Sequence, residues 1–217
     1  MGSNSIDNYC ERLDASFWSE PLNAITNLGF VIAGIIAIYY LITTRNKLTH
    51  LWILAINMIC IGVGSFLFHT FATPWAELAD KIPIYLFQVI FLWCYCQHAL
   101  SLKWSHTVIF FILYIGVTIL TKCLPFSING SEMYLPTIMT LIGAGIAYKY
   151  TNKALDHVII IAGGLFALSL IFRTIDESIC DLWPIGSHFL WHVTNGFVVY
   201  FCWLSLYRHA TLKSKSE

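Results

Sequence analysis

Three histidines have the types and spacing of a metal centre. His188 and His192 are four residues apart in the sequence HFLWH, and a helix places such residues on one face. His69 lies in a separate apolar stretch and would add a third imidazole from another helix. Three neutral imidazoles that leave a fourth position open are the ligand set of a catalytic zinc site. The pattern therefore predicts a zinc centre formed by His69, His188 and His192.

Two further polar residues accompany these histidines. Ser65 is four residues before His69 and would project from the same helix face. Asp80 lies in ELADKIP, just before another apolar stretch. An aspartate there can cap a helix, but ionisable groups close to a membrane core are more often functional. We therefore expect Ser65 and Asp80 to belong to the catalytic site.

A serine hydrolase is the competing interpretation. Ser65, His69 and Asp80 could form a nucleophile, a base and an orienting acid. The surrounding sequence GVGSFLFH lacks the G-x-S-x-G elbow of such enzymes. This scheme would also leave His188 and His192 without a role, whereas a zinc centre uses all five residues.

The composition is that of an integral membrane protein. Of the 217 residues, 58% are hydrophobic and 11% are charged, compared with about a quarter charged in soluble domains. A bilayer can solvate this apolar surface, whereas a soluble fold would expose large apolar patches. The formal net charge is zero and the sequence has no basic cluster, so nucleic acid is not an expected partner.

Seven apolar runs are long enough to cross a bilayer as helices, which takes about 20 residues each. They cover residues 22–42, 51–71, 82–100, 106–120, 134–148, 158–175 and 188–207. The predicted fold class is therefore an all-α integral membrane protein with seven transmembrane helices. We expect an outer N-terminal segment at residues 1–21, a transmembrane domain at 22–207 and a cytoplasmic tail at 208–217.

Basic residues predict the orientation, because short loops rich in lysine and arginine stay in the cytoplasm. With seven spans, most basic residues fall on one side: Arg45, Lys47, Lys103, Lys149, Lys153, Arg208, Lys213 and Lys215. This places the N-terminus outside and the C-terminus in the cytoplasm. His69, His188 and His192 then share one depth near the outer membrane surface. The expected location is a bacterial inner membrane, or an endoplasmic reticulum or Golgi membrane in a eukaryote.

These motifs resemble the alkaline ceramidase family, within a larger superfamily of seven-helix membrane hydrolases that includes the adiponectin receptors. The resemblance rests on S-x-x-x-H in GSFLFH, the aspartate of ELADKIP, H-x-x-x-H in the last span and the opening stretch DNYCERLDASFWSEPLNAITNL. It implies an amidase that uses zinc to hydrolyse ceramide to a sphingoid base and a fatty acid. It also implies three zinc ligands (His69, His188 and His192), a general acid and base (Asp80) and a residue that stabilises the oxyanion (Ser65).

The resemblance further implies a calcium site in the N-terminal segment. Calcium favours six to eight oxygen ligands in flexible geometry. The expected ligands are Asn8, Tyr9 through its carbonyl, Glu11, Asp14 and Glu20. The sequence departs from the family pattern, because Asn8 replaces an expected aspartate and Leu13 replaces an asparagine. A solvated acidic N-terminus without calcium is the alternative.

Two cysteines are candidates for a disulfide. Cys10 and Cys180 both fall on the outer side, and outer compartments are usually oxidising. Cys123 is a competing partner, whereas the family resemblance pairs Cys10 with Cys180. That disulfide would tie the N-terminal segment to the loop that enters the last span.

Three functional classes follow from the sequence. The first is a zinc-dependent amidase acting on ceramide or a ceramide-like lipid. The second is a serine-type intramembrane hydrolase, and the third is a seven-helix receptor or scaffold in which the metal is structural. Only the first predicts that zinc removal abolishes amide hydrolysis.

Overall fold

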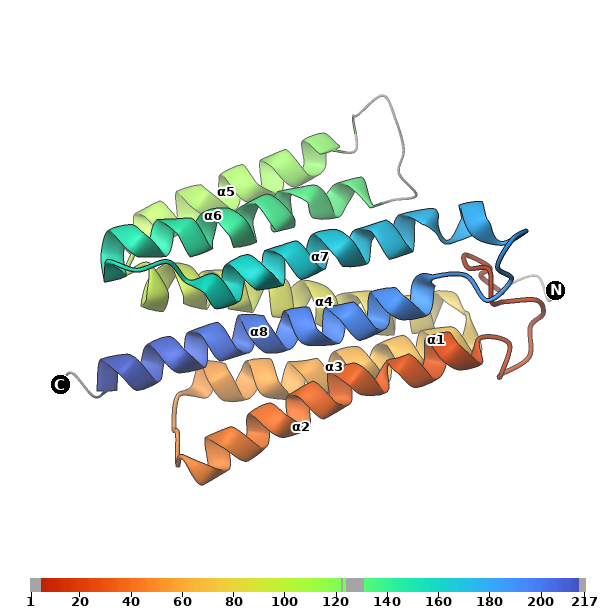
Figure 1. The fold of residues 1–217 in the computed structure, drawn as a ribbon, viewed down its shortest axis with the longest axis horizontal. Helices are drawn as coiled ribbons and strands as arrows, with labels where there is room; N and C mark the ends of the chain where they lie inside the picture. The colour runs from red at the N-terminus through yellow and green to blue at the C-terminus, as the bar shows by residue number, and fades with distance from the viewer. Residues whose placement is uncertain (1–4, 122, 124–130, 215–217) are drawn as a thin grey trace.

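Long helices lying side by side make up the protein (Figure 1). The computed structural model describes residues 5–121, 123 and 131–214, with side chains described up to residue 212. Consecutive long helices run in opposite directions along the bundle, as the short connections between them require (Figure 1). The α-helices are α1 Pro21–Thr26, α2 Leu28–Thr43, α3 Thr49–Phe71, α4 Pro74–Cys94, α5 Trp104–Thr121, α6 Leu135–Asn152, α7 His157–Ile175 and α8 His188–Ser214. Short helical turns are η1 Tyr95–Ala99, η2 Glu132–Tyr134 and η3 Glu177–Ile179.

Six helical segments are long and apolar enough to cross a membrane. Within the described residues they are Pro21–Thr43, Thr49–Phe71, Pro74–Ala99, Trp104–Thr121, His157–Ile175 and His188–Leu212. Each overlaps one of the predicted spans, so the all-α membrane class is confirmed. The remaining predicted span, residues 134–148, coincides with α6, which is not among these six. The number seven and the orientation of the termini therefore stay predictions.

The bounds of three spans differ from those predicted. The first helix is divided at Asn27, between α1 and α2. α4 begins at Pro74, whereas the predicted span began at residue 82. The prediction missed the first turns of this helix because they carry charged side chains, which lower the local hydropathy. α8 continues to Ser214, so most of the expected tail at 208–217 is helical. Asp80 therefore lies inside α4, and its interpretation as a helix cap is wrong, since Thr73 holds that position.

Apolar side chains cover both the inside and the outside of the bundle. Inside, Trp203 of α8 is fully buried and its Nε1 donates to the carbonyl oxygen of Leu51 in α3, at 3.0 Å. On α5, the large side chains of Ile112, Leu113 and Leu120 are 63–65% exposed. Such side chains are stable in contact with lipid. Thus α3 and α8 lie at the centre, and α5 lies at the periphery.

One end of the bundle gathers segments that are distant in sequence. The N-terminal segment, residues 5–20, lies beside the start of α8 and the end of α7 (Figure 1). α8 packs against α7, α2 and α3, and α3 packs against α4. The end of α3, the start of α4 and the start of α8 thereby meet at the end that carries the predicted site residues.

Candidate metal centre

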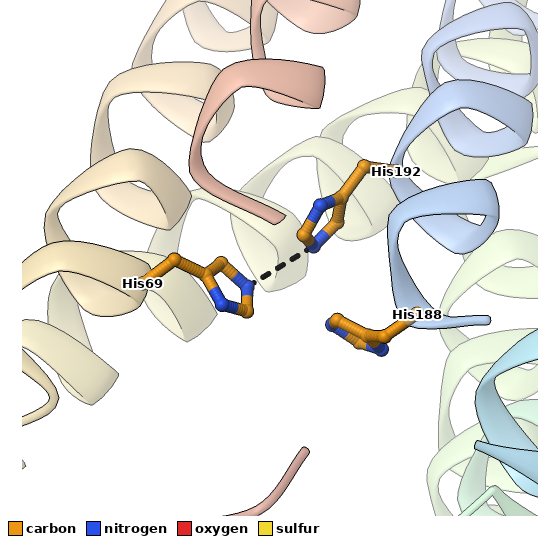
Figure 2. A group of neighbouring side chains, drawn as sticks. All are labelled: His69, His188 and His192. Carbon is orange, nitrogen blue, oxygen red and sulfur yellow. Dashed lines mark hydrogen bonds between the residues drawn. The ribbon is translucent and has the colours of Figure 1, made fainter. Parts of the chain in front are cut away.

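The three predicted metal ligands converge in a buried cluster. His69 comes from the end of α3, and His188 and His192 come from the first two turns of α8 (Figure 2). Each histidine is only 1–2% exposed, and one ring nitrogen from each lies within 4.8 Å of the other two. Among the described residues, this is the only group of three or more histidine, cysteine or acidic side chains with such geometry.

Hydrogen bonds assign the ring nitrogens of two of these histidines. Nδ1 of His69 donates to Oε2 of Glu20, at 2.5 Å. Nδ1 of His192 lies 3.1 Å from the Thr26 hydroxyl, which gives its own proton to the Leu22 carbonyl. Because a neutral imidazole has one donor and one acceptor nitrogen, both Nε2 atoms carry lone pairs.

These two lone pairs face each other. Nε2 of His69 lies 3.1 Å from Nε2 of His192 (Figure 2), a distance at which two ring nitrogens share either a proton or a metal cation. Two nitrogens of a tetrahedral zinc site, each 2.0–2.1 Å from the metal, are about 3.4 Å apart. Nδ1 of His188 is buried without a hydrogen-bond partner, which a metal would also explain. The donor set therefore fits zinc.

Ser65 and Asp80 lie beside this cluster. Ser65 is buried on α3, one turn before His69, and it is close enough to the Asp80 carboxylate to interact with it electrostatically. Oδ1 of Asp80 is buried and has no hydrogen-bond partner in the protein. The structure thus brings all five predicted residues together and leaves one carboxylate oxygen available to a substrate or to water.

Gly64 sets the distance between α3 and α4 at this point. A Cβ atom on Gly64 would lie 2.0 Å from the carbonyl oxygen of Ala79, next to Asp80. Pro83 interrupts α4 and has no N–H, so the Ala79 carbonyl lacks its usual helical donor. Gly64 was not among the predicted residues, although small residues in membrane helices are a signal for close helix packing.

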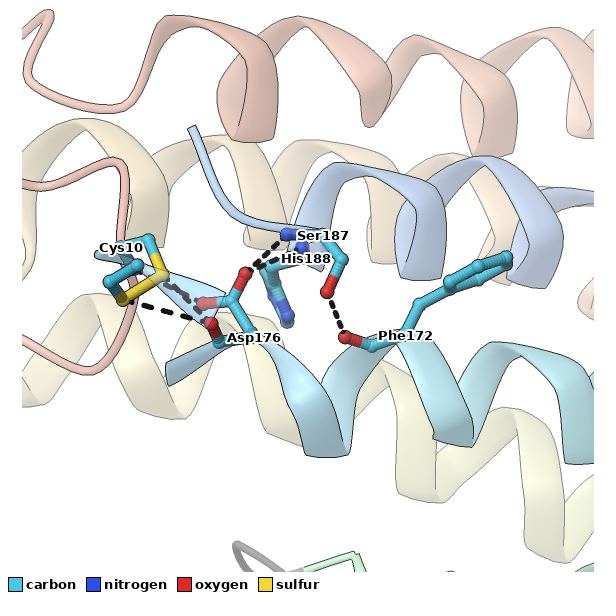
Figure 3. Close-up of a disulfide and its surroundings, with 6 residues drawn as sticks. Cys10, Phe172, Asp176, Ser187 and His188 are labelled. Atoms are coloured by element: carbon cyan, nitrogen blue, oxygen red, sulfur yellow. Dashed lines mark hydrogen bonds between the residues drawn. A yellow bond between two sulfur atoms is a disulfide. The ribbon is translucent and has the colours of Figure 1, made fainter. Parts of the chain in front are cut away.

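Asp176 fixes the start of α8. Its Oδ1 accepts hydrogen bonds from the backbone N–H groups of Ser187 and His188, at 2.6 and 2.9 Å, and its Oδ2 accepts from the N–H of Cys10 at 3.1 Å (Figure 3). Cys10 forms a disulfide with Cys180, with a Cα–Cα distance of 5.2 Å. The predicted disulfide is confirmed, and it holds the N-terminal segment against the metal centre.

Comparison with known proteins agrees with this arrangement. The family model described as Ceramidase matches residues 3–217. The chain belongs to the ceramidase family. It is also 23% identical over 242 residues to alkaline ceramidase YPC1 of Saccharomyces cerevisiae, an alignment that covers 94% of this chain and 76% of the yeast protein.

The competing disulfide partner and the competing nucleophile stand differently in this ceramidase-family structure. Cys123 is a free cysteine. Nδ1 of His69 bonds with Glu20 and its Nε2 faces His192, whereas a serine hydrolase needs a ring nitrogen that accepts the serine proton. This geometry favours the interpretation of His69 as a metal ligand.

Most of the calcium ligands predicted from the ceramidase resemblance are engaged by protein groups. Both oxygens of Glu11 accept hydrogen bonds from the first N–H groups of α1, at 2.7 and 2.8 Å. Oδ1 of Asp14 accepts from the N–H and hydroxyl of Ser16. Asn8 is exposed, and the carbonyl of Tyr9 accepts from the N–H of Arg12 at 3.2 Å. N–H and hydroxyl groups of the protein thus already bind oxygen atoms of Glu11, Asp14 and Tyr9.

Glu20 has the most constrained environment of the five. Oε1 contacts Nε of Arg12, and Oε2 contacts His69 and the side-chain amide of Asn23. Burial opposes ionisation, but the hydrogen bonds from His69 and Asn23 and the charge of Arg12 outweigh it and lower the pKa of Glu20. A guanidinium therefore stands beside this carboxylate, and the donor set does not fit calcium.

Proposed function

We propose that this protein is a zinc-dependent intramembrane amidase that hydrolyses the N-acyl bond of ceramide, or of a ceramide-like lipid, to a sphingoid base and a fatty acid. The observation that carries the proposal is the buried triad of His69, His188 and His192, with two lone-pair nitrogens 3.1 Å apart. Membership of the ceramidase family and similarity to a yeast alkaline ceramidase support the substrate class.

The residues around the triad have separate roles in amide hydrolysis. Bound zinc would supply Lewis acidity, which polarises the carbonyl and acidifies water. The free Oδ1 of Asp80 accepts a proton as water adds to the carbonyl carbon, and returns it to the nitrogen as the C–N bond breaks. The Ser65 hydroxyl donates to the oxyanion formed on the carbonyl oxygen.

A cavity inside the bundle is placed for a hydrocarbon chain. It has a volume of about 80 Å³ and is lined mainly by apolar side chains. On α4 its lining includes Ile84 and Gln88, one and two turns beyond Asp80, and on α8 it includes Trp191 and Asn195 on either side of His192. A chain held here would continue from an amide bond at Asp80 toward the membrane interior.

We also propose that α6 is a seventh span, so that the N-terminal segment faces the outer side and the C-terminus faces the cytoplasm. Support comes from the packing of α6 against α5 and α7, in line with the other long helices (Figure 1). The distribution of basic loops supports the orientation.

The function is tested with purified protein in detergent and ceramide as substrate. Strong chelation removes zinc and abolishes release of fatty acid, and stoichiometric zinc restores it. Hydrolysis that persists after complete removal of zinc would support the serine-type alternative. Absence of hydrolysis on any N-acyl lipid at full zinc occupancy would favour a receptor or scaffold with a structural metal.

Replacing Gly64 with alanine is expected to disable the site without removing a chemical group. The new Cβ must displace the backbone of α4 at Ala79, because it would lie 2.0 Å from that carbonyl. A shift of about 1 Å can cost about 10²-fold in rate, so we expect ceramide hydrolysis to fall by about that factor. The control is Gly116→Ala in α5, where nothing lies within 4 Å of the added Cβ. Equal activity of the two variants would contradict the close-approach argument.

A further inference from the structure

A buried chain of charged groups connects the N-terminal segment with the metal centre. Arg12 is 4% exposed and Glu20 is 2% exposed. Nε of Arg12 contacts Oε1 of Glu20, and Oε2 of Glu20 accepts from Nδ1 of His69 at 2.5 Å. A metal-binding histidine commonly donates its second ring nitrogen to a carboxylate in this way, which fixes both its tautomer and its orientation.

Arg12 also holds the backbone of the same ligand. Its Nη2 donates to the carbonyl oxygen of His69 at 2.9 Å, and its Nη1 donates to the carbonyl oxygen of Asp14 at 3.1 Å. His69 lies in the last turn of α3, where carbonyl groups lack helical partners and a positive charge is favoured. One guanidinium therefore fixes the side-chain partner of His69 and the end of its helix.

The charged and polar groups already bound to Glu20 oppose the binding of a divalent cation there. A buried carboxylate needs a compensating partner, and Arg12 supplies a permanent positive charge. Both oxygens of Glu20 are already engaged, Oε1 by Arg12 and Oε2 by His69 and Asn23. A calcium ion would have to displace the guanidinium or share a buried space with a second positive charge, which is costly at low dielectric.

We propose that Arg12 takes the place of a calcium ion in this chain, and that it acts as a positioning residue for His69 through Glu20. The metal centre is consequently independent of calcium. The proposal rests on the zinc centre of the proposed function and departs from the calcium dependence that the family resemblance implies.

The test compares wild type with Arg12→Gln and Arg12→Lys, and uses Lys103→Gln as a control for loss of an exposed charge, directly before α5. Zinc affinity is measured by competition with a chelator, and thermal unfolding is measured with calcium and with EGTA. Wild type and Lys103→Gln should unfold at the same temperature in calcium and in EGTA. Arg12→Gln should lose about 10- to 100-fold in zinc affinity, and Arg12→Lys should recover part of that loss.

The response of each protein to calcium tests whether the Arg12 guanidinium replaces a calcium ion. In Arg12→Gln the Oε1 atom of Glu20 loses its charged partner, so millimolar calcium should raise the unfolding temperature by mass action and restore zinc affinity. A calcium-dependent rise in the wild type, or unchanged zinc affinity in Arg12→Gln, would overturn the proposal. If Arg12→Gln does not fold, the wild-type calcium titration and the zinc affinity of Arg12→Lys decide. These readouts do not involve ceramide, so an inactive protein with this zinc and calcium behaviour would count against the proposed function alone.

Discussion

His188→Ala is expected to lose bound zinc and more than about 10³-fold in ceramide hydrolysis, because the metal that acidifies water is no longer held. The ring of His188 is buried, its Nδ1 has no other partner, and it stacks on Tyr9 with ring centroids 3.7 Å apart. Removal therefore deletes a ligand and opens a space that the rest of the site cannot fill.

The matched control is His106→Ala, which removes an exposed imidazole from α5. Metal analysis of the purified proteins should find zinc in the wild type and in His106→Ala at equal occupancy. Full zinc occupancy in His188→Ala would show that the triad is not the metal site.

Asp80→Asn is expected to retain zinc and to lose up to about 10⁴-fold in turnover, the upper end for general acid and base catalysis. Asparagine has the same shape and can still accept from Ser65, but it cannot accept and return a proton. Ser65→Ala should be milder, with a loss of about 10²- to 10³-fold, as for removal of one donor to an oxyanion.

Glu77→Gln provides the control on the same helix, since Glu77 forms a part-exposed ion pair with Lys81 and such pairs contribute little. Turnover and zinc content are measured for each variant. An inactive Ser65→Ala together with unaffected hydrolysis after zinc removal would establish Ser65 as a nucleophile. Near-normal turnover of Asp80→Asn would exclude Asp80 as the proton carrier.

Local patterns in the sequence were sufficient to predict the apolar helices and to single out three histidines that cluster in the folded chain. Apolar runs determine which segments enter a membrane, and the four-residue spacing of His188 and His192 requires only a helix. The same hydropathy signal failed at the start of α4, where the charged residues Glu77 and Lys81 belong to a helix that continues from Pro74. Asp80 therefore lies inside this helix rather than at its start, and its role in the site stays a prediction.

Residues whose role depends on tertiary contacts could not be found in this way. Asp176 is one of several acids in the loop before α8, and only the folded chain shows that it binds the N–H groups of Ser187 and His188. Arg12 was overlooked because the neighbouring acids indicated a bound cation. The sequence does not reveal that a side chain between them provides the positive charge.

The three-histidine cluster and its surroundings combine segments that are far apart in the chain. Glu20 precedes the first long helix, whereas His188 and His192 belong to the last, and the disulfide joins residues 170 positions apart. A growing polypeptide that has emerged only as far as α7 contains one of the three histidines and one of the two paired cysteines. A polypeptide that has not yet included α8 therefore cannot assemble the three-histidine cluster.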